Sequence, residues 1–204
     1  MTIAPDPTTD RIADRLDAAP AHLAALRARL AADATAAGLV DATYEVVDTP
    51  IGPLLIVATD RGVVRVAFEG EDHDAVLADL AATIGPRILQ APEPSVAATQ
   101  VAEYFAGRRR AFELPLDLRL VTGFRHDVVA HLAAIPYGTT ASYATVAADV
   151  GNPGAVRAVG TACARNPVPI LLPCHRVVRA DGTPGRYRGG DAAKRLLLAL
   201  ESAA

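Results

Sequence analysis

The residues of this chain best suited to covalent chemistry are Cys174 and His175, which are adjacent in the run Pro-Cys-His-Arg-Val-Val at 173–178. A thiol at its ordinary pKa is mostly protonated at neutral pH, so a nucleophilic cysteine needs a base, a nearby cation or a helix N-terminus. His175 and Arg176 offer a base and a cation within two residues of the thiol. The spacing therefore indicates nucleophilic catalysis by Cys174.

The sequence leaves two points about this pair open. An apolar run at 168–172 precedes the pair and predicts a buried, strand-like segment. Adjacent side chains on an extended chain point to opposite faces, so His175 would act on Cys174 either through a water molecule or across a bend. A free cysteine is also commonly a buried structural thiol, and adjacency to histidine does not exclude that alternative.

Cysteine usage and hydropathy limit the class of protein. Cys163 and Cys174 are the only cysteines, which is too few for a disulfide framework and does not match common zinc spacings. We expect reduced thiols, no metal, no cofactor, and Cys163 packed as a small apolar residue. The apolar stretches are far shorter than the roughly 20 residues of a membrane span, and no secretory signal is evident. These features predict a cytoplasmic protein without membrane contact.

Charge is distributed unevenly between the two halves of the chain. The net charge is −3, but residues 1–104 hold 7 Lys and Arg against 16 Asp and Glu, whereas residues 105–204 hold 13 against 7. A basic half can neutralise phosphates and release counterions, as a nucleic-acid-binding surface does. The asymmetry favours a polyanion partner for the C-terminal half, although it also arises by chance in Arg-rich sequences.

The elements before residue 122 predict a small α/β domain at 41–121 behind an extension at 1–40. The extension is a polar tail followed by an Ala-rich helix, interrupted at Pro20. Strands at 44–47, 54–59 and 63–68, separated by turns, form an antiparallel meander. Helices at 73–85 and 95–107 follow, and alternation at 114–120 predicts one more strand.

The elements after residue 122 predict a mostly helical domain at 122–204. A helix at 123–134 is followed by two short helices at 142–150 and 155–164, and the Gly-Asn-Pro-Gly turn between them gives helix-turn-helix geometry. That unit commonly places its second helix on DNA. The second helix carries small residues that permit close approach to another surface: Ala155, Ala158, Gly160, Ala162 and Ala164. A tightly packed internal helix pair is the alternative.

The run at 173–178 resembles the Pro-Cys-His-Arg-Val signature of the O6-alkylguanine-DNA alkyltransferases. Further motifs resemble the family in order and spacing: Ile-Pro-Tyr-Gly at 135–138, Ser-Tyr at 142–143, Gly-Asn-Pro at 151–153, Arg-Ala-Val-Gly at 157–160, Arg-Asn-Pro at 165–167, and Gly182, Gly185, Tyr187, Gly189, Gly190, Lys194 and Glu201. The resemblance covers residues 124–201 continuously and is weaker in the strands after residue 49.

This resemblance implies the fold and the activity. The fold would be α+β, with an N-terminal antiparallel-sheet, RNase H-like α/β domain and a helical C-terminal domain. The activity would be direct reversal DNA repair, in which the alkyl group of O6-alkylguanine, and also O4-alkylthymine, moves irreversibly and stoichiometrically to the cysteine. The partner would be double-stranded DNA, bound through the minor groove with the base flipped out by a protein that is monomeric when free.

The resemblance also implies roles for individual residues. Cys174 would be the nucleophile, activated through a hydrogen-bond chain from His175, commonly through water, to the carboxylate of Glu201. Tyr143 would neutralise the departing guanine, and Asn166 would tie the helix-turn-helix to the active-site segment.

Further roles concern DNA and the alkyl pocket. Arg157 would insert into the base stack, while Ala155, Ala158, Gly160, Tyr143 and Arg165 would lie at the minor groove. Residues 182–190, with Tyr187, Arg188 and Gly189, would close over the flipped base, supported by Lys194. The sequence equally allows Lys194 to be a solvated helix residue.

Several residues depart from the family pattern. Val129 stands where tryptophan is frequent, Cys163 lies in the second helix, and Arg186 and Arg188 are unusual in the closing loop. These arginines would either contact phosphate or narrow the pocket for bulky alkyl groups. Residues 1–40 hold no cysteine, so the zinc-dependent module of some relatives is not expected.

Three other functions compete with alkyl transfer. An alkyltransferase-like lesion sensor lacks the cysteine, so the presence of Cys174, His175 and Glu201 argues against it. A Cys-His hydrolase would turn over through a thioester. A non-catalytic interaction protein would have an unreactive Cys174 and would not bind DNA.

Overall fold

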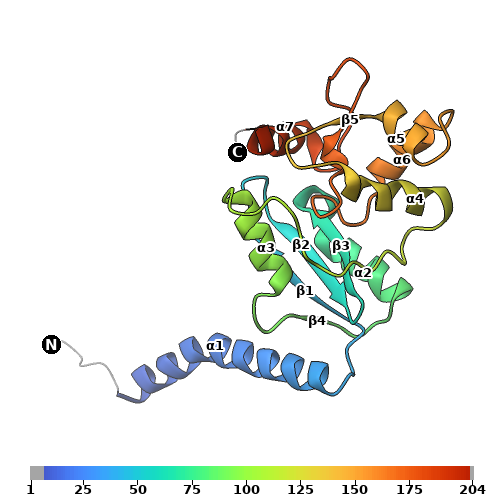
Figure 1. The fold of residues 1–204 in the computed structure, drawn as a ribbon. Helices are drawn as coiled ribbons and strands as arrows, with labels where there is room; N and C mark the ends of the chain where they lie inside the picture. The colour runs from blue at the N-terminus through green and yellow to red at the C-terminus, as the bar shows by residue number, and fades with distance from the viewer. Residues whose placement is uncertain (1–6, 203–204) are drawn as a thin grey trace.

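The structure is a computed structural model that describes the backbone of residues 7–202 and the side chains of residues 22–202. Residues 41–121 are termed the N-terminal domain below, and residues 122–202 the C-terminal domain. Helix α1 (Pro7–Ala36) precedes both and lies beside the sheet edge formed by β4 (Figure 1). Leu23, Leu26 and Leu30 of α1 are exposed, as expected of a surface extension.

A four-stranded sheet forms the centre of the N-terminal domain. Its strands are β1 (Ala42–Val47), β2 (Leu54–Thr59), β3 (Gly62–Phe68) and β4 (Ile88–Gln90), in the order β3-β2-β1-β4. The predicted antiparallel meander is confirmed for β1 to β3. Strand β4 runs parallel to β1 and was not predicted, because three residues are too few to show an alternating pattern.

Helices cover both faces of this sheet (Figure 1). After the short 3-10 turn η1 (Glu69–Glu71), α2 (His73–Thr83) packs Val76 and Leu80 against one face. The other face packs against α3 (Val96–Phe105) and against the C-terminal domain, in a core that joins Leu54 of β2 to Leu197 near the chain end. The two domains therefore share one hydrophobic core.

Helices dominate the C-terminal domain. In order they are α4 (Gly123–His131), η2 (Leu132–Ala134), α5 (Tyr143–Asp149), α6 (Val156–Ala164), η3 (Cys174–Arg176) and α7 (Gly190–Ser202). Strands β5 (Ala141–Ser142) and β6 (Val177–Val178) pair in parallel. The helix-turn-helix is formed by α5 and α6, and Gly151 takes the positive φ of 77° that the turn requires. The α+β fold class is confirmed.

Three local predictions were wrong. Helix α1 is continuous through Pro20, because an internal proline removes one hydrogen bond without having to end a helix. Residues 114–120 form only one bridge, between Leu116 and Val63, because the chain then turns: the Arg119 amide donates to the Asp117 carboxylate, and the Val121 amide donates to the Leu118 carbonyl. Residues 168–173 form a tight turn instead of a strand, with Ile170 at φ 74°.

No helix in residues 7–202 is long and apolar enough to cross a membrane.

Gly62 lies where the β2–β3 turn contacts the segment that leads to the C-terminal domain, and a substitution of this residue tests the contact. Its φ is 129°, and a Cβ there would lie 2.1 Å from the carbonyl oxygen of Pro115, which accepts a hydrogen bond from Val63. We expect Gly62→Ala to lower the free energy of unfolding by about 3 kcal/mol. Chemical denaturation measures the change, and Gly70→Ala, with open space around it, is the control. Equal effects of the two changes would contradict the prediction.

Candidate active site

The segment before Cys174 is folded back on itself by Asn166. The buried side chain of Asn166 donates to the Leu172 carbonyl at 2.8 Å and accepts from the Val168 amide at 3.1 Å. The Cys174 amide in turn donates to the Leu172 carbonyl at 2.8 Å. One amide side chain thus fixes the turn that follows α6 and delivers Cys174 to the start of η3.

Cys174 is buried, with 3% of its surface exposed. Burial raises the pKa of its thiol, while the Asn166 side chain and the positive charges of Lys194 and Arg188 act in the opposite direction. The resting thiol is therefore protonated and needs a proton acceptor before it can attack. Cys163 is also buried, and burial raises its pKa to about 12. Cys163 is packed as expected and is a poor nucleophile.

His175 follows Cys174 within η3, so a bend replaces the extended chain considered above. The ring is fully buried, and its Nε2 lies 2.8 Å from Glu201 Oε1. Because a carboxylate only accepts hydrogen bonds, Nε2 carries the proton and Nδ1 presents the lone pair. Nδ1 is buried and has no hydrogen-bond partner among the residues that the structure describes. It is the ring nitrogen available to take a proton.

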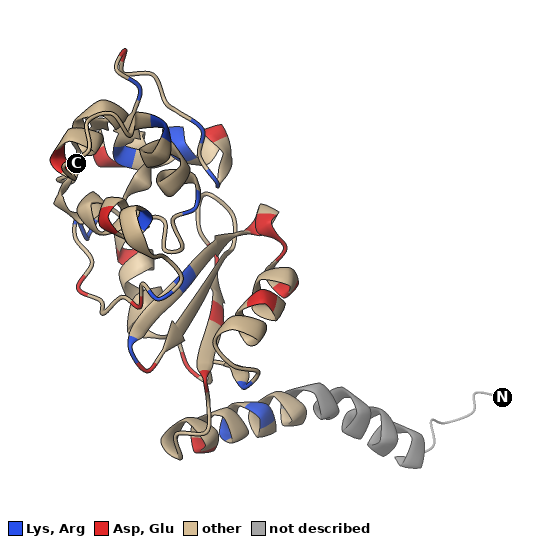
Figure 2. Cartoon of the chain, turned by 90° about the vertical axis from the view of Figure 1, so that its right-hand side faces the viewer, with Lys and Arg blue, Asp and Glu red and all other residues tan. Residues whose placement is uncertain are grey.

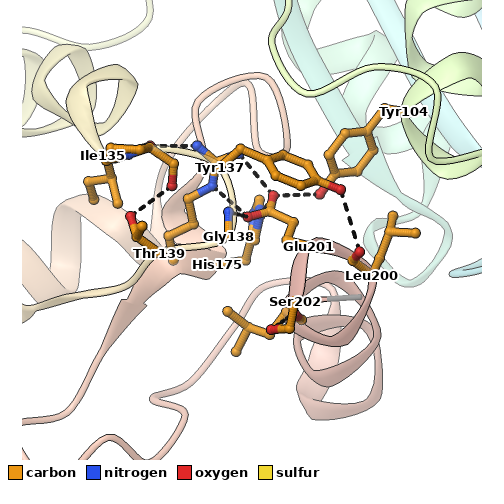
Figure 3. A network of polar contacts seen from close by, with 12 residues as sticks. Tyr104, Ile135, Tyr137, Gly138, Thr139, His175, Leu200, Glu201 and Ser202 are labelled. Carbon is orange, nitrogen blue, oxygen red and sulfur yellow. Dashed lines mark hydrogen bonds and ion pairs between the residues drawn. The ribbon is translucent and has the colours of Figure 1, made fainter. Parts of the chain in front are cut away.

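Glu201 of α7 receives hydrogen bonds from every side (Figure 3). Its Oε1 accepts from Tyr104 at 2.8 Å, Arg176 Nη2 at 2.9 Å and His175; its Oε2 accepts from Arg176 Nε at 2.8 Å and the Gly138 amide at 3.2 Å. Burial alone would raise its pKa, but the hydrogen bonds from His175, Arg176 and Tyr104 lower it to about 2. Glu201 is a permanent anion that can stabilise a positively charged His175.

Tyr104 and Arg176 both bind Glu201, and the sequence did not predict either contact. Tyr104 lies on α3 of the N-terminal domain, 97 positions before Glu201, and its hydroxyl reaches the carboxylate from across the shared core. An aromatic residue on the buried face of a helix predicts only packing, so no signal in the sequence could identify this contact. Arg176 was considered as a cation for Cys174, whereas its charge is paired with Glu201.

Lys194 is fully buried on α7 and donates from Nζ to the Val177 carbonyl at 2.6 Å. It is therefore not a solvated helix residue. Burial lowers the pKa of its ammonium group. The bond ties α7 to β6 directly after η3 and so fixes the far side of the active-site segment.

Tyr143 borders the site at the start of α5 and is half-buried. A Cβ on Gly185 would lie 2.2 Å from its hydroxyl oxygen, so the closing loop comes close to this ring. Burial and the neighbouring Cys163 and Cys174 raise its pKa. Tyr143 therefore keeps its proton and can donate it.

Helix α6 presents two different faces. Arg157 and Ala158 are exposed and Ala155 and Gly160 are half-buried, whereas Val159, Ala162 and Cys163 are buried against the core. Arg165, which follows the helix, is exposed. Lys and Arg residues gather on the helices and loops of the C-terminal domain (Figure 2). The residues expected to contact DNA are thus exposed or half-buried, unlike the buried residues around Cys174.

The end of the closing loop packs on the N-terminal domain. The Tyr187 ring lies edge-on to Phe68 at 5.4 Å and to His175 at 6.4 Å between centroids. Its hydroxyl is buried and has no hydrogen-bond partner within the described part of the chain. Arg188 forms an ion pair with Glu71 at 3.2 Å, so it is engaged within the protein. Gly189 touches the Phe68 ring so closely that a Cβ would lie 2.6 Å from it.

Comparison with known proteins assigns the family. Residues 42–118 match the ribonuclease-like domain of 6-O-methylguanine DNA methyltransferase, and residues 123–203 match its DNA-binding domain. The chain belongs to the 6-O-methylguanine DNA methyltransferase family. The methylated-DNA–protein-cysteine methyltransferase of Mycobacterium tuberculosis is 41% identical over 165 residues, which cover 78% of this chain and 91% of the relative.

Two solved structures have the same fold as this family member. The crystal structure of M. tuberculosis O6-methylguanine methyltransferase matches with a TM-score of 0.70 and 36% identity, over 79% of this chain and 93% of the other. The OGT of the same organism in complex with DNA matches with a TM-score of 0.68, 36% identity and the same coverage.

The buried His175–Glu201 pair predicts acid sensitivity. The Glu201 pKa of about 2 lies below its ordinary value of 4.5, and burial depresses the pKa of His175 below 6.5. Both groups bind protons more readily in the unfolded chain, so the free energy of unfolding should fall as the pH drops below about 6.5 and fall further below about 4.5. Denaturant unfolding across this range measures the effect.

Glu201→Gln should be less stable than the wild type at neutral pH and should lose less stability on acidification below about pH 4.5. Glu93→Gln, at an exposed position, is the control and should follow the wild-type pH dependence. A Glu201→Gln curve parallel to that of the wild type would contradict the prediction.

Proposed function

We propose that the protein repairs DNA by moving the alkyl group of O6-alkylguanine irreversibly and stoichiometrically to Cys174. The observation that carries this proposal is the buried Cys174–His175–Glu201 arrangement, in which Glu201 holds Nε2 of His175 and leaves Nδ1 free for a proton. Membership of the family and the match to a relative solved with DNA support it. The enzyme class is a methylated-DNA–protein-cysteine methyltransferase, a transferase.

The chemistry balances with side chains of this chain and solvent water. The Cys174 thiol gives its proton through a bridging water molecule to His175 Nδ1, and the resulting imidazolium is stabilised by Glu201, as in triad logic. The thiolate attacks the alkyl carbon in line; the carbon–sulfur bond forms as the carbon–O6 bond breaks, and the electron pair goes to O6. Tyr143 donates a proton to the departing guanine and recovers one from His175 through solvent, so the thiol proton ends on guanine.

The product explains the single use of each molecule. An S-alkyl cysteine has no acyl carbonyl for water to attack, and Cys163, with its raised pKa, is no acceptor for the group. The thioether on Cys174 is therefore permanent. The same attack applies to O4-alkylthymine, which carries an alkyl ether beside a ring nitrogen in the same way.

Because Cys174 is only 3% exposed, a base inside a duplex has to leave the stack to reach it. Flipping costs a few kcal/mol in stacking and pairing, and an inserted side chain can fill the gap. We assign this insertion to Arg157, which is exposed on α6. The small Ala155, Ala158 and Gly160 beside it suit the narrow minor groove, which favours binding without sequence preference.

In this proposal Arg165 contacts the DNA beside α6, and Tyr187, Gly189 and the Lys194-supported segment line the pocket. A single chain holds the complete set of groups, so the free protein is taken to act as a monomer.

Intact-protein mass after incubation with duplex DNA containing O6-methylguanine tests the transfer. We expect one added methyl group per wild-type molecule, because the reaction consumes Cys174, and no addition to Cys174→Ser. A protein that remains folded and unmodified would contradict the proposed function, whereas release of product with turnover would indicate hydrolase chemistry.

Comparing repair of duplex DNA with reaction of the free base O6-benzylguanine distinguishes a role of Arg157 in base flipping from a role in the transfer step. We expect Arg157→Ala to slow repair in duplex DNA by about tenfold or more, since a lost insertion costs a few kcal/mol of flipping, while reaction with the free base changes less than twofold. Arg61→Ala, at an exposed turn of the N-terminal domain, is the matched control and should leave both rates unchanged. If Arg157→Ala slowed both reactions equally, the proposal that Arg157 inserts into the base stack would be wrong.

A further inference from the structure

The closing loop, residues 182–190, is held by different domains at its two ends. At its start Pro184 forms a bridge with Val178, and the Arg179 amide donates to the Thr183 carbonyl at 2.9 Å. Its first part is exposed and begins at Gly182 with φ 80°. Its last part is fixed where Tyr187 and Gly189 pack on Phe68 and Arg188 pairs with Glu71. Phe68 and Glu71 belong to the N-terminal domain, so the position of residues 187–189 depends on that domain.

Glu71 is itself held rigidly. Its Oε1 accepts from the Phe68 amide at 3.0 Å, and its Oε2 pairs with the buried Arg65 as well as with Arg188. Arg65 also donates to the carbonyl of Pro167, next to the Asn166 turn that delivers Cys174. The same carboxylate therefore connects the closing loop to the segment beneath the nucleophile.

The anchored end of the loop lies over the reacting sulfur. Tyr187 faces the ring of His175, and Gly185 presses against the hydroxyl of Tyr143. Arg188 is close enough for its charge to lower the pKa of Cys174 against the raising effect of burial. Residues 185–189 thus border the side chains that surround Cys174.

We propose that the Glu71–Arg188 ion pair is a latch through which the N-terminal domain fixes the outer wall of the alkyl pocket and selects small alkyl groups over bulky ones. The proposal rests on the proposed function and adds its substrate preference. A methyl group fits beneath the latched loop, whereas a benzyl group requires the loop to move outward. When the loop moves outward, Arg188 separates from Glu71. The free-energy cost of breaking this ion pair therefore slows the reaction of the bulky substrate and not that of the methyl substrate.

Arg186 provides an internal comparison in the same loop. It is exposed and forms no ion pair within the described residues, whereas Arg188 is engaged by Glu71. A phosphate contact would fit Arg186 better than Arg188. The latch therefore assigns different roles to two arginines that the sequence leaves equivalent.

The test compares Arg188→Gln with the wild type, using free O6-benzylguanine and free O6-methylguanine so that DNA contacts do not enter. Arg188→Gln leaves the Arg65–Glu71 pair in place, which a change of Glu71 would not. For a partly exposed ion pair we expect the benzyl-to-methyl rate ratio to rise about three- to fivefold. Arg188→Lys, which keeps the cation, and Arg186→Gln should stay near the wild-type ratio.

Hydrogen exchange of residues 182–190 supplies a second readout that needs no reaction. We expect faster exchange in Arg188→Gln than in the wild type or in Arg186→Gln. An unchanged ratio, an equal fall of both rates, or unchanged exchange would overturn the latch. Wild-type protein that transfers no methyl group from duplex DNA would instead refute the proposed function, and the selectivity proposal with it.

Discussion

A carboxylate in a protein interior remains ionised only when enough donors replace the water that it has lost. Glu201 meets this condition with donors from α3, the Gly138 turn and η3, which are distant in sequence. Each donor fixes the element that carries it. The orientation of the His175 ring, and the contact of Tyr104 with the C-terminal domain, both follow from satisfying one buried charge.

The shared core explains how a site near the chain end can depend on the first half of the chain. The sheet face that contains Leu54 and Phe68 packs against the C-terminal helices instead of facing solvent. Tyr104 can therefore reach Glu201, and Phe68 can support Tyr187 and Gly189. The N-terminal domain is thus part of the active-site structure, although the nucleophile and the expected DNA-contacting helix lie outside it.

The charged residues of this protein have different structural roles, which the composition does not show. Arg176 neutralises Glu201 inside the core, and Arg65 and Arg188 share Glu71 at the domain boundary. Arg157 and Arg165 remain exposed on the side of α6. Only part of the positive charge of the C-terminal half is therefore available to phosphates, and the rest holds the site together.

The sequence by itself determined the meander, the helix-turn-helix and the Cys174–His175 motif, because each depends on neighbours within a few residues. It did not predict the turn at Ile170, where local apolarity favours a strand but the Asn166 hydrogen bonds impose a bend. Only the tertiary structure decided the contacts of Tyr104 with Glu201 and of Arg188 with Glu71. Those contacts join residues far apart in the chain, and they exist because the two domains pack against each other.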